Sequence, residues 1–172
     1  MLYKWLGSGI LLLAGGYLSV FFSRMEKKRL TVLDSYISLL RFIKGQIDCY
    51  ATPIHHILTL ADPSLLSLCM GQDGEGSPQP YPISLDLSDT SPLLPMIAQS
   101  RLYLEPESER LLLNFATELG QTYRAEQVMR CEHYIGALGE ERRKLAEASP
   151  QRVRMSSILC LCSSLGLVVL LW

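Results

Sequence analysis

The side chains best suited to metal chemistry lie in two clusters, Cys49 with His55-His56 and Cys131-Glu132-His133. A zinc site needs four ligands that converge, and closely spaced ligand pairs help to form one. Adjacent histidines point in different directions on a helix, and Cys-x-His is not a typical ligand pair. We therefore predict a core cysteine at position 131, exposed histidines and no metal site.

No other constellation predicts a reaction. The glycines at 71, 74 and 76 are not followed by Gly-Lys-Ser/Thr, so they do not form a phosphate-binding loop. Carboxylate pairs such as Asp86/Asp89 and Glu140/Glu141 fall in loop-like or charge-rich segments, where we expect them to be solvated. The net charge of −1 gives no general attraction to nucleic acid. We expect no catalytic residue, no cofactor, no nucleic-acid partner and no small-molecule substrate.

Two apolar runs dominate the chain of 172 residues. Neither Trp5–Ser23 nor Met155–Trp172 contains Asp, Glu, Lys or Arg. As helices they would span roughly 27–29 Å, close to the ~30 Å hydrocarbon layer of a bilayer. We predict transmembrane helices at 5–23 and 155–172, with a helical bundle domain at 24–154. A cleaved signal peptide is the alternative for the first run, but its length and the basic residues after it favour an anchor.

Basic residues flank the inner side of both predicted spans: Arg24, Lys27, Lys28 and Arg29, then Arg142, Arg143, Lys144, Arg152 and Arg154. The positive-inside rule therefore predicts a two-pass protein of the cell membrane, with the domain in the cytoplasm and both termini outside. Neither run contains an ionisable Asp, Glu, Lys, Arg or His, so transport by this chain alone is not expected.

The periodicity of the middle region predicts helices throughout. An amphipathic helix continues from the first span to about Tyr50, and Thr52-Pro53 and Asp62-Pro63 each begin a short helix. Residues 71–82 are predicted to be a flexible loop. The structure and role of 83–104 stay open: Ile83, Leu85 and Leu87 alternate as in a strand, whereas the prolines that follow favour a turn and a short helix.

Two more helices complete the predicted bundle. The first covers about 106–119 and stops at Gly120, with its apolar face at Leu111, Leu112, Phe115, Ala116 and Leu119. Thr122 caps the second, whose apolar stripe is Val128, Cys131, Ile135, Leu138 and Leu145. Ser149-Pro150 breaks or kinks the chain before the second span. The predicted fold is an all-α, membrane-anchored antiparallel helical bundle, with an N-terminal and a C-terminal transmembrane helix.

Small residues recur along one face of each predicted span: Ser8, Gly15, Ser19 and Ser23 in the first, and Ser156, Cys160 and Ser164 in the second. Such spacing allows helix backbones to approach closely in a membrane. We expect these positions to pack the spans together or against partner subunits, and the sequence leaves those two possibilities open.

The order of these features resembles stage III sporulation protein AB of endospore-forming bacteria. The first matching block is the glycine-bearing helix, basic stop, leucine-rich helix and Thr-Pro turn at Gly15-Gly16, Arg24–Arg29, Leu39-Leu40 with Ile47, and Thr52-Pro53. The second block, Phe115–Gln127, keeps Phe115, Leu119, Gly120, Arg124 and Gln127. The capping box of the family is absent, because Ala125 follows Thr122 where the family has glutamate, and 71–104 does not match well.

The resemblance implies a non-enzymatic membrane platform or scaffold subunit of the channel between mother cell and forespore. The family is similar to the F-type inner-membrane platform proteins of type II secretion, whose helical bundles sit above a secretion ATPase. Implied partners are other channel membrane subunits, this cytoplasmic ATPase (the AA subunit) and membrane lipid, with the domain in the mother-cell cytoplasm. A membrane-tethered adaptor or signalling protein unrelated to secretion is the alternative.

Overall fold

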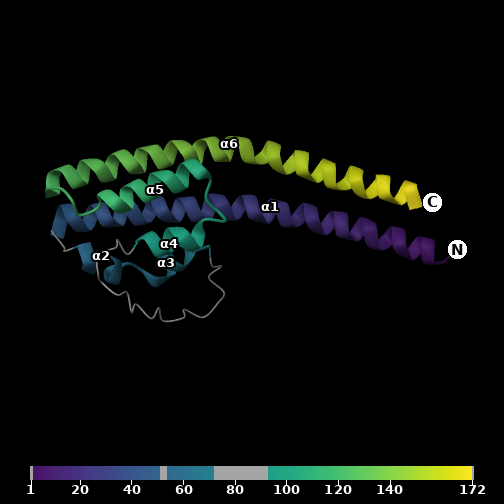
Figure 1. Cartoon of the computed structure of the whole chain (residues 1–172), viewed down its shortest axis with the longest axis horizontal. Helices are drawn as coiled ribbons and strands as arrows, with labels where there is room; N and C mark the ends of the chain where they lie inside the picture. The colour runs from purple at the N-terminus through teal and green to yellow at the C-terminus, as the bar shows by residue number, and fades with distance from the viewer. Residues whose placement is uncertain (1, 51–53, 72–92, 172) are drawn as a thin grey trace. The chain divides into compact units, whose positions relative to one another are not determined.

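The computed structural model describes the backbone of residues 2–50, 54–71 and 93–171, and the side chains of 14–50, 56–71, 93–160, 162–164 and 166. Every element in this part is a helix, which confirms the predicted all-α class (Figure 1). The elements are α1 (Leu2–Gly45), the π-helix η1 (Gln46–Tyr50), α2 (Ile54–Leu60), α3 (Pro63–Cys69), α4 (Leu93–Ser100), α5 (Pro106–Glu118) and α6 (Arg124–Leu171).

The chain divides into two compact units. The first unit comprises Met1–Lys28 and Lys144–Trp172, and the second comprises Arg29–Arg143. The long helices α1 and α6 contribute to both units, whereas η1 and α2 to α5 belong to the second unit alone.

The core of the second unit is built on α1. Its buried residues follow helical spacing and form one apolar face: Val32, Leu33, Tyr36, Ile37, Leu39, Leu40 and Ile43. From α6, Cys131, Tyr134 and Leu138 are buried as well. Two ion pairs, Asp34–Arg142 and Lys44–Glu132, join the two helices. The earlier residue of α1 pairs with the later residue of α6, and the later residue of α1 pairs with the earlier residue of α6. Within this unit, α1 and α6 therefore run antiparallel, as predicted.

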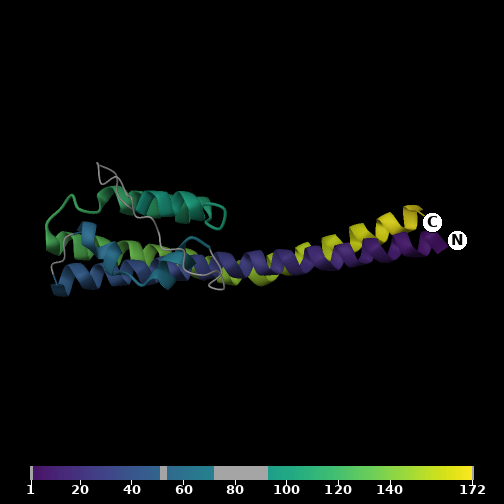
Figure 2. The same ribbon diagram turned by 90° about the horizontal axis from the view of Figure 1, so that it is seen from below.

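The shorter helices cover this pair. α4 and α5 pack against each other and lie on one side of α1 and α6 (Figure 2). The buried hydroxyls of Tyr36 and Ser100 are 2.7 Å apart, which joins α1 to α4. Phe115 of α5 and Tyr134 of α6 stack edge to face, with ring centroids 5.5 Å apart.

Local signals explain most of the helix ends. Asp62 caps α3, since its carboxylate accepts a hydrogen bond from the Ser64 N–H at 2.9 Å, and Pro63 occupies the first turn. Gly120 follows α5 with φ of +93°, a backbone conformation that suits glycine at a helix C-terminus. Thr52 and Pro53, most of the predicted loop 71–82, and the candidate strand at 83–87 lie outside the described residues.

One prediction about α6 is wrong: Thr122 does not cap it, because the Thr122 hydroxyl is buried without a hydrogen-bond partner and the helix begins at Arg124. For Ser149-Pro150 the sequence predicts a break or a kink. The break does not occur, since α6 continues through Pro150 to Leu171. Proline removes one backbone donor and crowds the preceding turn. The hydrogen bonds on both sides of Pro150 keep the helix continuous.

In the first unit, residues 14–28 of α1 and 144–164 of α6 lie side by side in both views (Figures 1 and 2). Among the described residues, no helix is both long and apolar enough to cross a membrane. The side chains of residues 5–13 in the first predicted span, and of 167–172 in the second, lie outside the described residues.

Candidate functional site

The apolar faces of α1 and α6 in the second unit are each interrupted by a basic residue. Lys44 takes one expected apolar position, and its Nζ lies 2.6 Å from Glu132 Oε1 on α6. Arg142 takes another, and its Nε and Nη2 donate to the two carboxylate oxygens of Asp34 at 2.5 and 3.0 Å. The basic residues that break the sequence pattern therefore each form an ion pair between α1 and α6.

These contacts raise the pKa of both cations. The hydrogen bond to Glu132 is the main cause of the raised pKa of Lys44, and the hydrogen bond to Asp34 is the main cause for Arg142. A raised pKa means that the contact with a carboxylate favours the charged form of the base. Both bases therefore keep their charge throughout the neutral range, and each loses it only as the pH rises through its raised pKa.

The end of α1 changes its hydrogen-bonding pattern beside the Lys44–Glu132 pair. After Gly45 the chain forms the π-helix η1, a rare type of turn that is frequent at functional sites. The guanidinium of Arg124, the first residue of α6, donates to the backbone carbonyl of Asp48 in this turn. Arg124, which the sequence singled out, thereby joins the beginning of α6 to the end of α1.

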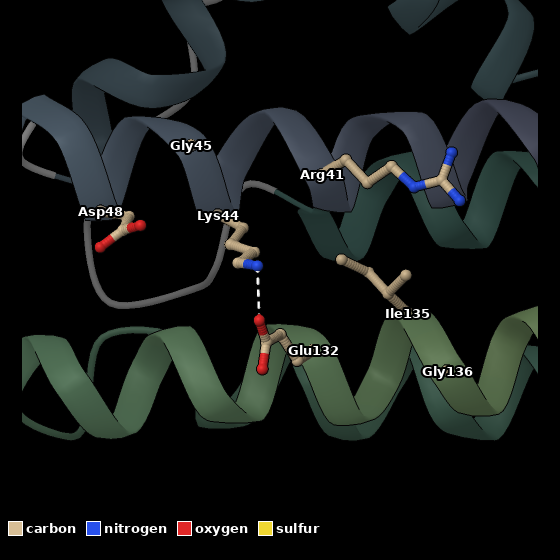
Figure 3. Close-up of a pocket in the computed structure, with 7 residues that line it drawn as sticks. All are labelled: Arg41, Lys44, Gly45, Asp48, Glu132, Ile135 and Gly136. Atoms are coloured by element: carbon tan, nitrogen blue, oxygen red, sulfur yellow. Dashed lines mark hydrogen bonds and ion pairs between the residues drawn. The ribbon is translucent and has the colours of Figure 1, made fainter.

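An open groove of about 590 Å³ lies on this face of the second unit, and we call it the α1–α6 groove. It is lined by Arg41, Lys44 and Gly45 from the end of α1, by Asp48 from η1, and by Glu132, Ile135 and Gly136 from α6. Figure 3 shows the Lys44–Glu132 pair crossing between the two helices, with Ile135 extending from α6 toward α1. Ile135, predicted to be core, is only half-buried and forms the apolar part of the lining.

The lining of the groove does not suggest a reaction centre. Among the described residues, no three His, Cys, Asp or Glu side chains converge closely enough to hold a metal ion. Cys131 is buried, and that burial raises the pKa of its thiol to about 11, whereas His133 is exposed.

Some of the small residues named from the sequence lie between the two helices of the first unit. The Oγ atoms of Ser19 and Ser157 are 2.7 Å apart, although Ser157 was not among the predicted positions. Gly15 is buried, and a Cβ atom at that position would lie 3.0 Å from the Ser164 Oγ and 3.5 Å from the Cys160 carbonyl oxygen. Ser156, also predicted, donates to the Val153 carbonyl of its own helix.

The other candidate positions lie around the junction of α5 and α6. The Leu119 N–H donates to the Phe115 carbonyl at 3.0 Å and closes α5 before Gly120. Gln127 is buried in the first turn of α6, although the sequence pattern placed it outside the apolar stripe. Gly45 and Gly136 in the groove were not predicted. The sequence does contain a signal that could have drawn attention to them, because each is a glycine within a predicted helix, where alanine would be more stable.

Residues 96–172 match the family model described as stage III sporulation protein AB. No curated protein and no solved structure matches the chain. The matched segment contains the second of the two blocks on which the sequence resemblance rested, and it covers most of α4 with all of α5 and α6. The suspected resemblance is therefore supported: over residues 96–172 the chain is similar to stage III sporulation protein AB, a family whose role lies in stage III of sporulation.

Proposed function

We propose that the protein is a non-enzymatic membrane scaffold subunit of the secretion-like channel between mother cell and forespore, and that it engages a cytoplasmic secretion ATPase. The observation that carries this proposal is the match of α5 and α6 to the stage III sporulation family. The helical domain supports it, because a shared core and ion pairs join its two longest helices. The described residues contain no cluster of side chains that could hold a metal ion. Such a domain is suited to presenting surfaces to partners.

The membrane part of the proposal rests on the two apolar runs and on the small residues in the first unit. Gly15, Ser19, Ser157 and Ser164 meet across the two helices that carry those runs. Close approach through glycine and serine is the usual way in which helices associate in lipid, where burial of apolar surface provides no driving force. The basic inner flanks support the proposed orientation, with the domain in the cytoplasm and both termini outside. The resemblance to the sporulation family supports the proposal that this is the cytoplasm of the mother cell.

A topology experiment tests the membrane part. The full chain, tagged at either end, is produced in the cells, and spheroplasts are treated with an external protease. We expect both tags to be removed while the helical domain stays intact, and we expect the protein to remain with the membrane after a high-salt wash. Protected tags, or release of the protein by salt, would contradict the two-pass arrangement.

In-cell crosslinking tests the partner part. A photoreactive residue is introduced at exposed positions of the domain during sporulation, for example in place of Tyr50, Tyr123 or Arg110. We expect one patch of positions to crosslink the secretion ATPase and other positions to be silent. If no position crosslinks a channel subunit and the channel assembles normally without this protein, the adaptor interpretation replaces the proposal.

A further inference from the structure

The apolar runs on the two helices of the first unit end at nearly the same level. The contact between the hydroxyls of Ser19 and Ser157 fixes the register of α1 against α6, and Gly15 facing Ser164 shows that the two helices run antiparallel. Arg24 follows Ser19 by five residues, whereas Arg154 precedes Ser157 by three. At about 1.5 Å per residue, the two arginines lie roughly 7.5 and 4.5 Å from the serine contact, in the same direction along the pair. The boundaries between apolar and charged residues therefore differ in level by about 3 Å.

Basic side chains of both helices gather at this level, and we call them the basic collar. The collar consists of exposed or half-buried residues of the first unit: Arg24, Lys27, Lys28, Arg152 and Arg154. Within 24–28 and 152–154, five basic residues and one acidic residue, Glu26, give a net charge of +4. Arg24 and Arg154 are exposed, and neither forms an ion pair with another described residue. The collar therefore presents positive charge to its surroundings.

On the other side of the boundary the surface of the first unit is apolar. Its large exposed side chains come from both helices: Tyr17, Leu18, Val20, Phe21 and Phe22 of α1, and Met155, Ile158 and Leu159 of α6. A contiguous group of exposed apolar side chains marks a surface that meets another molecule or a membrane. Positive charge and apolar surface thus meet at one level on both helices.

The order of the two surfaces decides the class of ligand. Arginine binds phosphate through two parallel hydrogen bonds, so phosphate is a suitable anion for the collar. A nucleic acid or a free phosphate would satisfy the collar but would leave the adjoining apolar side chains in water. A phospholipid joins a phosphate to acyl chains, and the head groups of one leaflet all lie at one level. A phospholipid therefore matches both surfaces and the alignment of the collar across the two helices.

We propose, on the basis of the membrane part of the proposed function, that the basic collar binds the head groups of anionic phospholipids. A zwitterionic head group brings a cation with each phosphate, and so leaves the net charge of the collar uncompensated. An anionic head group neutralises that charge, and each basic residue close to an anionic membrane strengthens the attraction about fivefold. The inference goes beyond the proposed orientation, because the positive-inside rule concerns the side of the membrane and not the class of lipid.

The lipid selectivity of the full-length chain tests this inference. The chain is reconstituted into phosphatidylcholine vesicles that contain a trace of spin-labelled phosphatidylglycerol or of spin-labelled phosphatidylcholine. Electron spin resonance then measures the fraction of each label that the protein immobilises. We expect the wild type to bind the anionic label about fivefold more strongly than the zwitterionic label. That preference should shrink in 1 M salt, where the Debye length is about 3 Å.

Three double variants separate the collar from net charge in general. Arg24→Gln with Arg154→Gln removes two exposed collar charges, so most of the preference for the anionic label should disappear. Arg24→Lys with Arg154→Lys keeps the charges and should keep most of the preference. Arg101→Gln with Arg110→Gln is the matched control, because it removes two exposed arginines of the second unit and should leave the selectivity unchanged. Circular dichroism verifies that each variant is helical.

Two results would overturn the collar as the binding site: equal binding of both labels by the wild type, and the same loss of selectivity in the collar and control variants. Loss of the selectivity on addition of soluble glycerol phosphate at constant ionic strength would show that the collar recognises phosphate alone, and would overturn the assignment to lipid. A wild-type chain that stays in the bilayer without preferring the anionic label refutes this inference and leaves the proposed function standing. A chain that does not enter the bilayer refutes the membrane part of the proposed function as well.

Discussion

Helices α1 and α6 lie side by side in both units of the chain, but different side chains join them in each. In the first unit the contacts involve glycine and serine: Gly15 lies against Ser164, and the hydroxyls of Ser19 and Ser157 are 2.7 Å apart. In the second unit large apolar side chains form the core, and ion pairs such as Lys44–Glu132 lie at its edge. The same two helices therefore use two kinds of contact.

The difference is the one expected for two solvents. In water, burial of large apolar side chains stabilises a helix pair, and charged side chains at the edge stay hydrated. In lipid, apolar side chains gain little from leaving the solvent, so close packing of small residues and interhelical hydrogen bonds become more important. The contrast is consistent with a domain in water whose two long helices continue into a membrane, as proposed above.

The largest expected effect comes from the core of the second unit. Leu138→Ala should lower the free energy of unfolding by about 2–5 kcal/mol, because the side chain is 0 % exposed and its removal leaves a cavity. Ile135→Ala, three residues away on the same helix but half-buried, is the control and should have a clearly smaller effect. Denaturant unfolding of the full chain in detergent measures both, and equal losses would show that α6 does not bury one face more than the other.

Cysteine reactivity compares the two units directly. Cys49 in the second unit and Cys162 in the first both have exposed side chains, whereas Cys131 is buried. In inverted membrane vesicles, we expect a membrane-impermeant maleimide to label Cys49 and to spare Cys162, because a thiolate does not form in lipid. Detergent denaturation should make both equally reactive. Rapid labelling of Cys162 in intact vesicles would show that the first unit is in water. The two kinds of helix contact could then not be explained by two different solvents.

Cys131 provides an internal standard for that experiment. Burial raises the pKa of its thiol from about 9 to about 11, so at pH 8 its thiolate fraction falls about 100-fold. Labelling of Cys131 should therefore be slow in the folded chain, and should accelerate as the pH rises toward 11 or when the domain unfolds. Mass spectrometry of the peptides distinguishes the sites.

Much of the fold was predictable from local patterns. Three-four spacing of apolar residues identified the helices, and Asp62-Pro63 gave the start of α3 correctly. One local signal was misleading, because Thr122 does not cap α6. At Ser149-Pro150, where the sequence predicts a break or a kink, the break does not occur. A proline inside a helix costs about 3 kcal/mol, and the many other hydrogen bonds of a 48-residue helix offset that cost.

The site was less predictable than the fold. Lys44 and Arg142 take positions where the helical spacing calls for an apolar residue, but the sequence could not name their partners, which are distant in the chain. It identified Gly15 because small residues recur there, whereas Gly45 and Gly136 lie on separate helices, and only the antiparallel pairing brings them to one groove. Which residue faces which depends on helix register, and register comes from tertiary packing.

A substitution in the packed first unit should have an effect on helix pairing that is smaller than that of Leu138→Ala on unfolding and larger than the coupling of a surface ion pair. Gly15→Leu should weaken the pairing of α1 with α6 by about 1–3 kcal/mol, because a Cβ atom there already lies 3.0 Å from the Ser164 Oγ. Gly16→Leu is the matched control, since no heavy atom lies within 4 Å of its Cβ position. The yield of a disulfide between cysteines placed at Ser19 and Ser157 reports the pairing. The same loss of yield in both variants would contradict the register in which Gly15 faces Ser164.

The smallest expected effect is that of the Arg142–Asp34 pair. Both side chains are 47 % exposed, so solvent screens the pair, and a double-mutant cycle with Arg142→Ala and Asp34→Ala should give a coupling of about 0.2–1 kcal/mol. That coupling should fall in 1 M salt, because the Debye length shortens to about 3 Å. The effect of Gly15→Leu should not change with salt, since it arises from steric contact between uncharged groups. A salt-independent coupling of Arg142 with Asp34 would mean that packing by the arginine side chain, and not charge, joins α1 to α6 at this point.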